Sequence, residues 1–179
     1  MGLKVLLFAP GILNIFIIDL ITGIFMQDAV KEIMSRHLET IDVTENAQEA
    51  AKRMNGKRIS SVLVVDSHKK NEQPIGIVTE RDLVKRVCAA GINSKEIGVR
   101  EIMSSPIATI EPEATVETAA DLMLSNRVRH LIVVDEQTRK PVGIIAPSDL
   151  NKYLRANIDM DEVNARILDA VKAEELTEP

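Results

Sequence analysis

Aromatic residues and cysteine are scarce in this chain of 179 residues, which has no tryptophan, one tyrosine, three phenylalanines and one cysteine, Cys88. A single cysteine excludes an internal disulfide framework and cannot by itself hold a zinc ion. Val84 and Val87 lie near Cys88 on a predicted helical face, so we expect its thiol to be a small buried group rather than a nucleophile. A chain of this length buries roughly two-thirds of its unfolded surface, so the fold needs no cross-link.

An excess of positive charge is also missing, because the net charge is −5 at pH 7. Non-specific nucleic-acid binding requires a dense basic surface, and none is present, so we expect no nucleic-acid partner. The sequence also lacks a Walker loop, a nucleophile elbow and paired catalytic carboxylates with a base, which argues against an enzyme. His37 and His68 have no companions that would complete a metal site, and we expect both at the surface. These absences predict a cytoplasmic protein with neither a metal nor a catalytic centre.

The three phenylalanines all lie in residues 1–25, an apolar segment whose composition differs from the rest of the chain. Its length is close to the roughly 20 residues that cross a bilayer. However, Pro10 interrupts it, and Asp19 would cost up to about 3 kcal/mol deep inside a membrane. Three alternatives stay open: Met26 is the true start, the segment packs as a helix on a partner subunit, or it is a membrane anchor. We leave the segment outside the functional core and expect no membrane association unless it is an anchor.

The chain contains an internal repeat, which is the most informative feature of the sequence. "VKEIMS" at 30–35 returns as "VREIMS" at 99–104, an offset of 69 residues. After a loop that is two residues shorter in the second copy, "GIVTERDL" at 76–83 returns as "GIIAPSDL" at 143–150. The predicted organisation is an N-terminal extension (1–25), a first repeat (26–92), a second repeat (93–155) and a C-terminal amphipathic helix with a tail (156–179).

Each copy predicts the same succession of helices and strands. Ala47, Ala50, Ala51 and Met54 follow the spacing of one apolar helix face, and the second copy repeats this spacing from Val116 to Met123. In the first copy, Asn46 with Glu49 predicts the start of that helix, and Asn55-Gly56 predicts its end. The apolar runs "SVLVVD" and "HLIVVD" are typical of strands buried on both faces. The sequence therefore predicts an α/β fold of two β-α-β-β-α units packed about a pseudo-two-fold axis.

Over residues 28–155, the order and duplication of "IMS", Thr40-Ile41, "VLVVD" and "GIVTERDL" resemble a pair of CBS domains, the tandem called a Bateman module. The resemblance implies a regulatory, non-catalytic module that needs no cofactor and binds an adenine nucleotide such as AMP, ADP or ATP. It also implies a disc-shaped homodimer and a role such as energy sensing. Because no catalytic domain accompanies the pair, we expect it to act on itself or on an unidentified protein partner.

Thr79 and Asp82 have two possible roles. Thr79 ends a strand and can cap the following helix, with Asp82 at its third position. The carboxylate of Asp82 could instead accept hydrogen bonds from two ribose hydroxyls, which are strong charge-assisted bonds. The resemblance implies the second role, with the threonine at the ribose-phosphate edge. In the second copy Asp149 is kept but Ala146 replaces the threonine, so we expect an asymmetric module whose Asp82 site binds better.

The resemblance also implies the other site residues. Basic residues at the entrance of the second buried strand are expected to cross the pseudo-two-fold axis and contact phosphates, and adenine is expected to rest on Thr40, Ile41 and Ile59. The Arg129-His130 order reverses the order in the best-known nucleotide sensors, which leaves the role of each residue open. The main site is expected to comprise Thr40, Ile41, Ile59, Thr79, Arg81, Asp82, Arg129 and His130, and the weaker site Arg58, Thr109, Ile110, Val128, Ser148 and Asp149.

A structural dimerisation or adaptor domain with vestigial clefts is the alternative function. The sequence distinguishes neither the adenosine ligand nor the number of occupied clefts.

Overall fold

The structure is a computed structural model that describes residues 27–68 and 73–157. The extension predicted for residues 1–25 lies outside the described residues, and so does all but the start of the helix and tail predicted for 156–179. The elements follow one another as α2 (Val30–Ile33), β1 (Thr40–Asp42), α3 (Ala47–Lys57), β2 (Ser61–Val65), β3 (Gly76–Thr79), α4 (Glu80–Leu83), the π-helix η1 (Val84–Cys88), α5 (Val99–Ile102), β4 (Thr109–Ile110), α6 (Val116–Ser125), β5 (Leu131–Val134), β6 (Pro141–Ile145) and α7 (Pro147–Asn157).

Each repeat forms a three-stranded sheet with the same topology. In the first sheet β2 lies between β1, which is parallel to it, and β3, which is antiparallel. The second sheet repeats this order, with β5 between the parallel β4 and the antiparallel β6. The central strands β2 and β5 are buried over almost their whole length, as their β-branched composition predicts. The predicted fold of two α/β repeats about a pseudo-two-fold axis is confirmed.

Helix α3 begins where the sequence predicts and ends later. The Asn46 side chain accepts a hydrogen bond from the Glu49 backbone N–H at 3.1 Å, which is the predicted N-terminal cap. The predicted end at Asn55-Gly56 is wrong, because the helix continues to Lys57 and its C-cap is Arg58, with φ 55° and ψ 44°. Glycine inside a helix costs only about 1 kcal/mol, so it does not by itself end one. The left-handed residue that turns the chain towards β2 is therefore an arginine.

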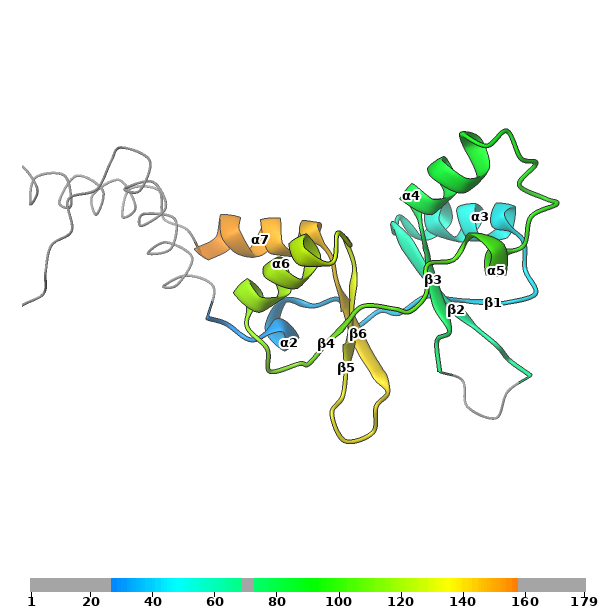
Figure 1. The fold of residues 1–179 in the computed structure, drawn as a ribbon. Helices are drawn as coiled ribbons and strands as arrows, with labels where there is room; N and C mark the ends of the chain where they lie inside the picture. The colour runs from blue at the N-terminus through cyan, green and yellow to red at the C-terminus, as the bar shows by residue number, and fades with distance from the viewer. Residues whose placement is uncertain (1–26, 69–72, 158–179) are drawn as a thin grey trace, which may run out of the picture.

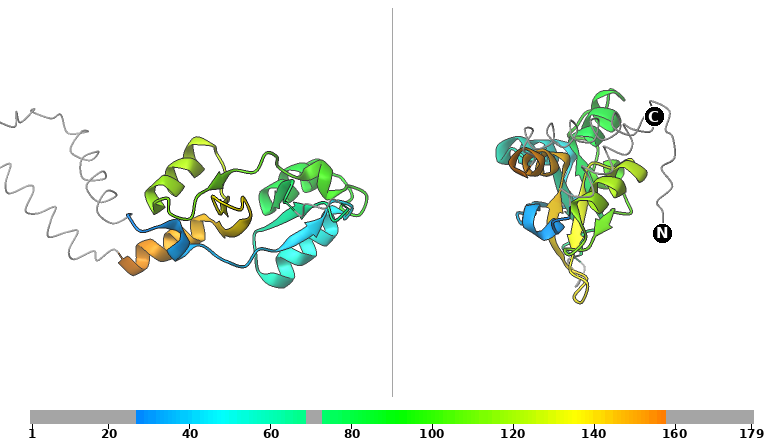
Figure 2. Two further views of the ribbon diagram at one scale, coloured as in Figure 1. Left: turned by 90° about the horizontal axis from the view of Figure 1, so that it is seen from below. Right: turned by 90° about the vertical axis from the view of Figure 1, so that its left-hand side faces the viewer.

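The short helix that precedes each repeat packs on the other half of the molecule. The N–H of Val30 at the start of α2 donates to Ala114 O at 2.8 Å, and the Tyr153 hydroxyl of α7 donates to Asp28 at 2.9 Å. Conversely, the N–H of Val99 at the start of α5 donates to Glu45 O at 2.9 Å. Figure 1 shows α2 beside α6 and α7, and α5 beside α3 and α4; both views of Figure 2 keep α2 next to α7. The two halves are therefore joined by crossed helices.

Apolar side chains of both sheets also meet between the halves. Leu63, Ile77 and Ile132 form one buried cluster, to which Ile107 and Ile144 add partly buried surface. Beside it, Gly76 has no room for a side chain because Met103 lies against it, and Gly143 is covered by Met34 in the same way. The methionine of each "IMS" motif thus contacts the sheet of the other half, and this close approach requires the glycine.

The prediction for Cys88 is wrong, since this residue is exposed. It ends the π-helical turn η1, in which its neighbour Val87 is buried instead. Within the part of the chain that the structure describes, no helix is long and apolar enough to span a membrane.

Candidate functional site

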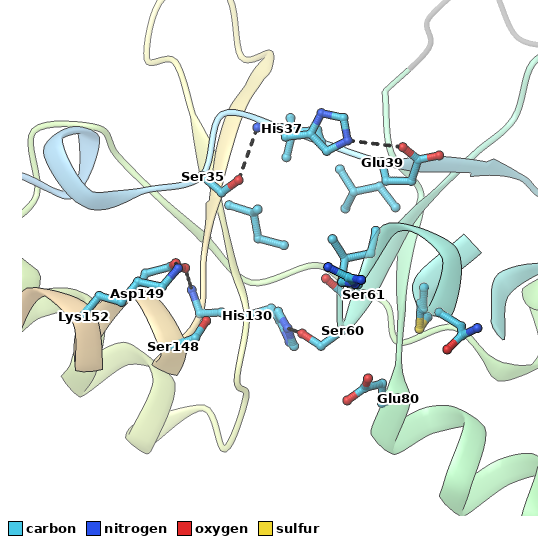
Figure 3. A pocket seen from close by; sticks show the side chains of 18 residues that line it. Ser35, His37, Glu39, Ser60, Ser61, Glu80, His130, Ser148, Asp149 and Lys152 are labelled. Atoms are coloured by element: carbon cyan, nitrogen blue, oxygen red, sulfur yellow. Dashed lines mark hydrogen bonds and ion pairs between the residues drawn. The ribbon is translucent and has the colours of Figure 1, made fainter. Parts of the chain in front are cut away.

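Two clefts of unequal size lie where the repeats meet. The larger, about 640 Å³, is the Asp149 cleft, in which Ser148, Asp149 and Lys152 of α7 lie opposite Ser60 of the first repeat (Figure 3). Arg58 and Ile59 of the first repeat also line it. The smaller, about 110 Å³, is the Asp82 cleft, lined by Thr79, Arg81 and Asp82 together with Arg127, Val128 and Arg129 of the second repeat. Each cleft thus combines the start of one repeat's last helix with the loop before the other repeat's central strand.

The carboxylate of Asp82 is occupied by the protein itself. Its Oδ2 accepts hydrogen bonds from the Thr79 backbone N–H at 2.9 Å and the Thr79 hydroxyl at 2.7 Å. Its Oδ1 accepts one from the Ser104 hydroxyl at 3.1 Å and faces Arg86 Nε at 3.7 Å. Asp82 is only 8% exposed. The arrangement is a complete capping box with two further partners, which leaves this carboxylate little capacity for a ligand.

The carboxylate of Asp149 is much less engaged. Its Oδ2 accepts one hydrogen bond, from the Ala146 backbone N–H at 2.9 Å. Its Oδ1 has no partner in the described part of the chain closer than Lys152 Nζ, at 4.0 Å. At Asp82 the Thr79 hydroxyl adds a second hydrogen bond to Oδ2, which Ala146 cannot supply, while Ser104 and Arg86 engage Oδ1. The Asp149 cleft is the larger one, and its aspartate accepts fewer hydrogen bonds from the protein. The sequence predicts the opposite, that the Asp82 cleft is the better site.

Five of the residues predicted for the main site lie together in the structure. Thr79, Arg81, Asp82, Arg129 and His130 line one cleft together, as grouped from the sequence.

The assignment of two apolar residues is corrected. Ile59 lines the Asp149 cleft and Val128 the Asp82 cleft, the reverse of the prediction. The reason is the crossed packing: the loop before the central strand faces the last helix of the other repeat.

The residues at the first strand of each repeat contribute little to the clefts. Ile41 and Ile110 are core side chains, 1% and 5% exposed, and line neither cleft. Thr40 is exposed and its carbonyl accepts a hydrogen bond from Arg53 at 2.7 Å, while Thr109 lines a separate cavity of about 280 Å³. The residues just before these strands reach the clefts instead, Leu38 and Glu39 in the Asp149 cleft and Ala108 in the Asp82 cleft.

His130 lies between the clefts and lines both. Its Nε2 is 2.9 Å from the hydroxyl of Ser60, across the boundary between the repeats. Burial lowers the pKa of His130 to about 4, helped by the positive charges of Arg129 and Arg81 and opposed by Asp82. The imidazole is therefore neutral at neutral pH and forms a shared polar wall (Figure 3).

Sequence reasoning missed several residues of the Asp149 cleft. His37 is exposed, as predicted, but it lines this cleft and lies 3.5 Å from Glu39, which also faces Lys57 at 2.9 Å. Lys152 lies at the opposite wall. The segment around His37 directly follows the repeated "IMS" motif. This position within the repeat could have indicated that the segment lines a cleft.

The chain belongs to the CBS-domain family, because the CBS domain model matches residues 30–89 and 99–156. It is 38% identical over 134 residues to an uncharacterized protein of Methanopyrus kandleri, covering 73% of this chain and 66% of that one. It is 32% identical to a CBS domain-containing protein of Bacillus subtilis, covering 68% and 82%. The fold and the duplicated clefts are thus those of a CBS pair, a regulatory module rather than a member of a catalytic family.

Solved structures show the same architecture. A signal-transduction protein with CBS domains from Burkholderia ambifaria, described as putative, has a TM-score of 0.67 at 32% identity, covering 73% of this chain and 96% of that one. A CBS domain protein of Pyrobaculum aerophilum complexed with AMP has a TM-score of 0.61 at 25% identity, covering 68% and 89%. A hexameric CBS-CP12 protein from bloom-forming cyanobacteria has a TM-score of 0.63 at 32% identity, covering 80% and 84%. One similar protein thus binds AMP, and another is an oligomer.

Proposed function

We propose that this CBS pair is a regulatory module that binds an adenosine-containing ligand such as AMP, ADP or ATP, and that the Asp149 cleft is its principal site. The observation that carries the proposal is Oδ1 of Asp149, which accepts no hydrogen bond from the described residues and lies 4.0 Å from Lys152 Nζ, in a cleft of about 640 Å³. This volume lies within the roughly 300–1,000 Å³ typical of small-molecule sites, whereas the Asp82 cleft is too small in this state for a nucleoside. The AMP complex of the Pyrobaculum protein supports the ligand class.

The lining of the Asp149 cleft suits the parts of such a ligand. Asp149 offers a carboxylate to the ribose hydroxyls, as the family resemblance implies, and Ser148 beside it can donate a further hydrogen bond. Leu38, Ile59 and Ile144 give the cleft an apolar wall for the adenine ring. Arg58 and Lys152 supply positive charge for phosphate groups. No metal or cofactor is needed for this recognition.

Isothermal titration calorimetry of the purified protein with AMP, ADP and ATP tests the proposal. For Asp149→Ala we expect a loss of affinity of about 10- to 100-fold, because a charge-assisted hydrogen bond is worth roughly 1.5–3 kcal/mol. The matched control is Asp82→Ala, for which we expect a smaller loss. The proposal fails if the wild type binds no adenosine compound or if Asp82→Ala lowers the affinity more than Asp149→Ala.

A homodimer is part of the proposal. Leu124 of α6 and Val84 of η1 are 76% and 61% exposed, which is unusual for large apolar side chains that have no partner surface. Helix faces of a second copy would cover them, and the hexameric neighbour supports association of CBS pairs.

The alternative, a structural dimerisation or adaptor domain, predicts a dimer by sedimentation without any response to nucleotide. An unidentified protein partner and a cytoplasmic location stay predictions from the sequence.

A further inference from the structure

A third cavity, of about 280 Å³, lies beside the strand ends of the two β-hairpins, and neither Asp82 nor Asp149 lines it. In Figure 1 both hairpins, β2–β3 and β5–β6, point towards the bottom of the view. The wall of this cavity is mostly apolar and comes from both repeats: Pro74 and Ile75 of the first, and Pro106, Ile107, Val134 and Pro141 of the second. The cavity therefore depends on the tandem, as the two clefts do.

The polar groups of this cavity that remain available are hydrogen-bond donors. Among the residues that the structure describes, Arg139 is the one charged residue that lines the cavity. Its guanidinium forms no hydrogen bond or ion pair with another described residue, so its five N–H donors are available. The exposed hydroxyl of Thr109 likewise has no partner in the described ranges, whereas the Ser105 hydroxyl donates to Ile75 O at 3.0 Å. This combination of a cation and an apolar wall favours an anion with an apolar body.

The β5–β6 turn holds Arg139 in an unfavourable conformation. Its φ is 56°, and such a left-handed backbone costs a residue with a Cβ roughly 1–2 kcal/mol. Asp135 fixes the turn: its carbonyl accepts the Arg139 N–H at 2.9 Å, and its Oδ1 accepts the backbone N–H and the hydroxyl of Thr138 at 2.7 and 2.8 Å. Strained residues of this kind are concentrated at functional sites. A functional use of the side chain would account for an arginine at this position.

We propose that this cavity binds a small monocarboxylic acid with an apolar body, and that Arg139 is the residue that binds its carboxylate. A planar guanidinium binds both oxygens of a carboxylate at once, and the apolar wall covers the hydrocarbon part. A phosphate monoester carries close to two negative charges and would find no second cation in the described lining. The site is independent of the proposed nucleotide site, because its lining includes neither Asp149 nor His130.

The size of the cavity sets the size of the acid. Because a water molecule in the liquid occupies about 30 Å³, a cavity of about 280 Å³ holds roughly nine atoms of that size. Hexanoate fits this space and a nucleoside does not. Hexanoate is therefore a suitable probe, and the uncharged hexanamide is its matched control.

Titration of the ¹⁵N-labelled protein with hexanoate, followed by two-dimensional NMR, tests the site. We expect saturable shift changes at residues 73–75, 105–109 and 139–141. Hexanamide should bind about tenfold more weakly, because it cannot form the charge-assisted pair with the guanidinium.

Substitution of Arg139 separates its binding role from a structural one. Asparagine accepts the left-handed conformation more readily than arginine does, so the melting temperature of Arg139→Asn should not fall below that of the wild type. The affinity of this variant for hexanoate should fall about tenfold. Arg139→Lys should keep part of the affinity, because an ammonium group keeps the charge but not the planar fork.

Lys140→Asn is the matched control variant. It removes the same charge from the next residue of the turn, which does not line the cavity. Its affinity for hexanoate should stay within about twofold of the wild type, since salt screens an exposed charge that makes no contact with the ligand.

Three results would overturn the proposal. Equal losses of affinity in Arg139→Asn and Lys140→Asn would remove the assigned role of Arg139. Shift changes centred on Val84 and Leu124 would show that hexanoate binds exposed apolar side chains instead of the cavity. A wild-type spectrum that does not change with hexanoate would exclude the site. An AMP titration in the same spectra tests the proposed function separately, and its failure would leave the carboxylate site in place.

Discussion

The Asp82 and Asp149 clefts are built from equivalent residues of two repeats, yet they present their aspartates in different ways. In the first, Thr79 and Ser104 saturate the carboxylate from inside the protein. In the second, Oδ1 of Asp149 accepts no hydrogen bond from the described residues and lies 4.0 Å from Lys152 Nζ, and the cleft is larger. The comparison teaches that the same aspartate can be saturated by the protein in one repeat and left accessible in the other. A more complete capping motif therefore leaves less acceptor capacity for the proposed ligand.

The largest effect expected from this comparison is on stability. Asp82→Ala leaves the donors of Thr79, Ser104 and Arg86 without their acceptor in a nearly buried place, at a cost of about 3 kcal/mol. Asp149→Ala removes a single hydrogen bond and should cost about 1 kcal/mol or less. Urea unfolding followed by circular dichroism measures both. Equal losses in the two variants would contradict the different engagement of the two carboxylates.

A second prediction concerns the wall that the clefts share. The pKa of His130 is lowered to about 4 in the folded protein, against about 6.5 when unfolded. As the pH falls, His130 therefore binds a proton in the unfolded chain before it does so in the folded protein. The stability that the neutral imidazole contributes is fully present above about pH 6.5 and is lost as the pH falls towards 4. Between pH 7 and pH 5 the free energy of unfolding should fall by about 2 kcal/mol from this residue alone.

The same unfolding series on His130→Asn isolates this contribution, since asparagine does not titrate. The decline between pH 7 and pH 5 should be flatter in that variant. Parallel curves for the two proteins would show that the imidazole of His130 is not buried as described.

The smallest expected effect comes from a substitution that makes the two aspartate sites alike. It is also the most direct comparison of the two clefts. Ala146→Thr restores the hydroxyl that the second repeat lacks, which should cap α7 and raise stability by about 1 kcal/mol. In the first repeat the Thr79 hydroxyl donates to Oδ2 of Asp82, so the new hydroxyl should donate to Oδ2 of Asp149 and leave Oδ1 available. Nucleotide affinity should therefore change by less than about threefold while the melting temperature increases, and a loss of affinity of tenfold or more would contradict this geometry. Val142→Thr, outside both clefts, controls for adding a hydroxyl near β6.

The fold could be predicted from the sequence because its evidence is local and duplicated. The apolar spacing from Ala47 to Met54 and the run "SVLVVD" define their own elements, and each appears twice. The division of residues between the clefts could not, because Ile59 and Val128 reach theirs only through the crossing of the repeats. The saturation of Asp82 depends on Ser104, which is 22 residues away in the chain.

The crossed helices α2 and α5 have a consequence for any attempt to divide the protein. A fragment that stops at residue 92 lacks Val99 and Ile102, both fully buried against the first half, and would expose the apolar surface they cover. Cleavage of the chain after Gly91 should leave the two pieces associated. The first piece keeps α2, which packs on the second half, and the second piece keeps α5, which packs on the first half. Neither repeat has a complete hydrophobic interior by itself, so we expect the tandem to be the smallest unit of this protein that folds.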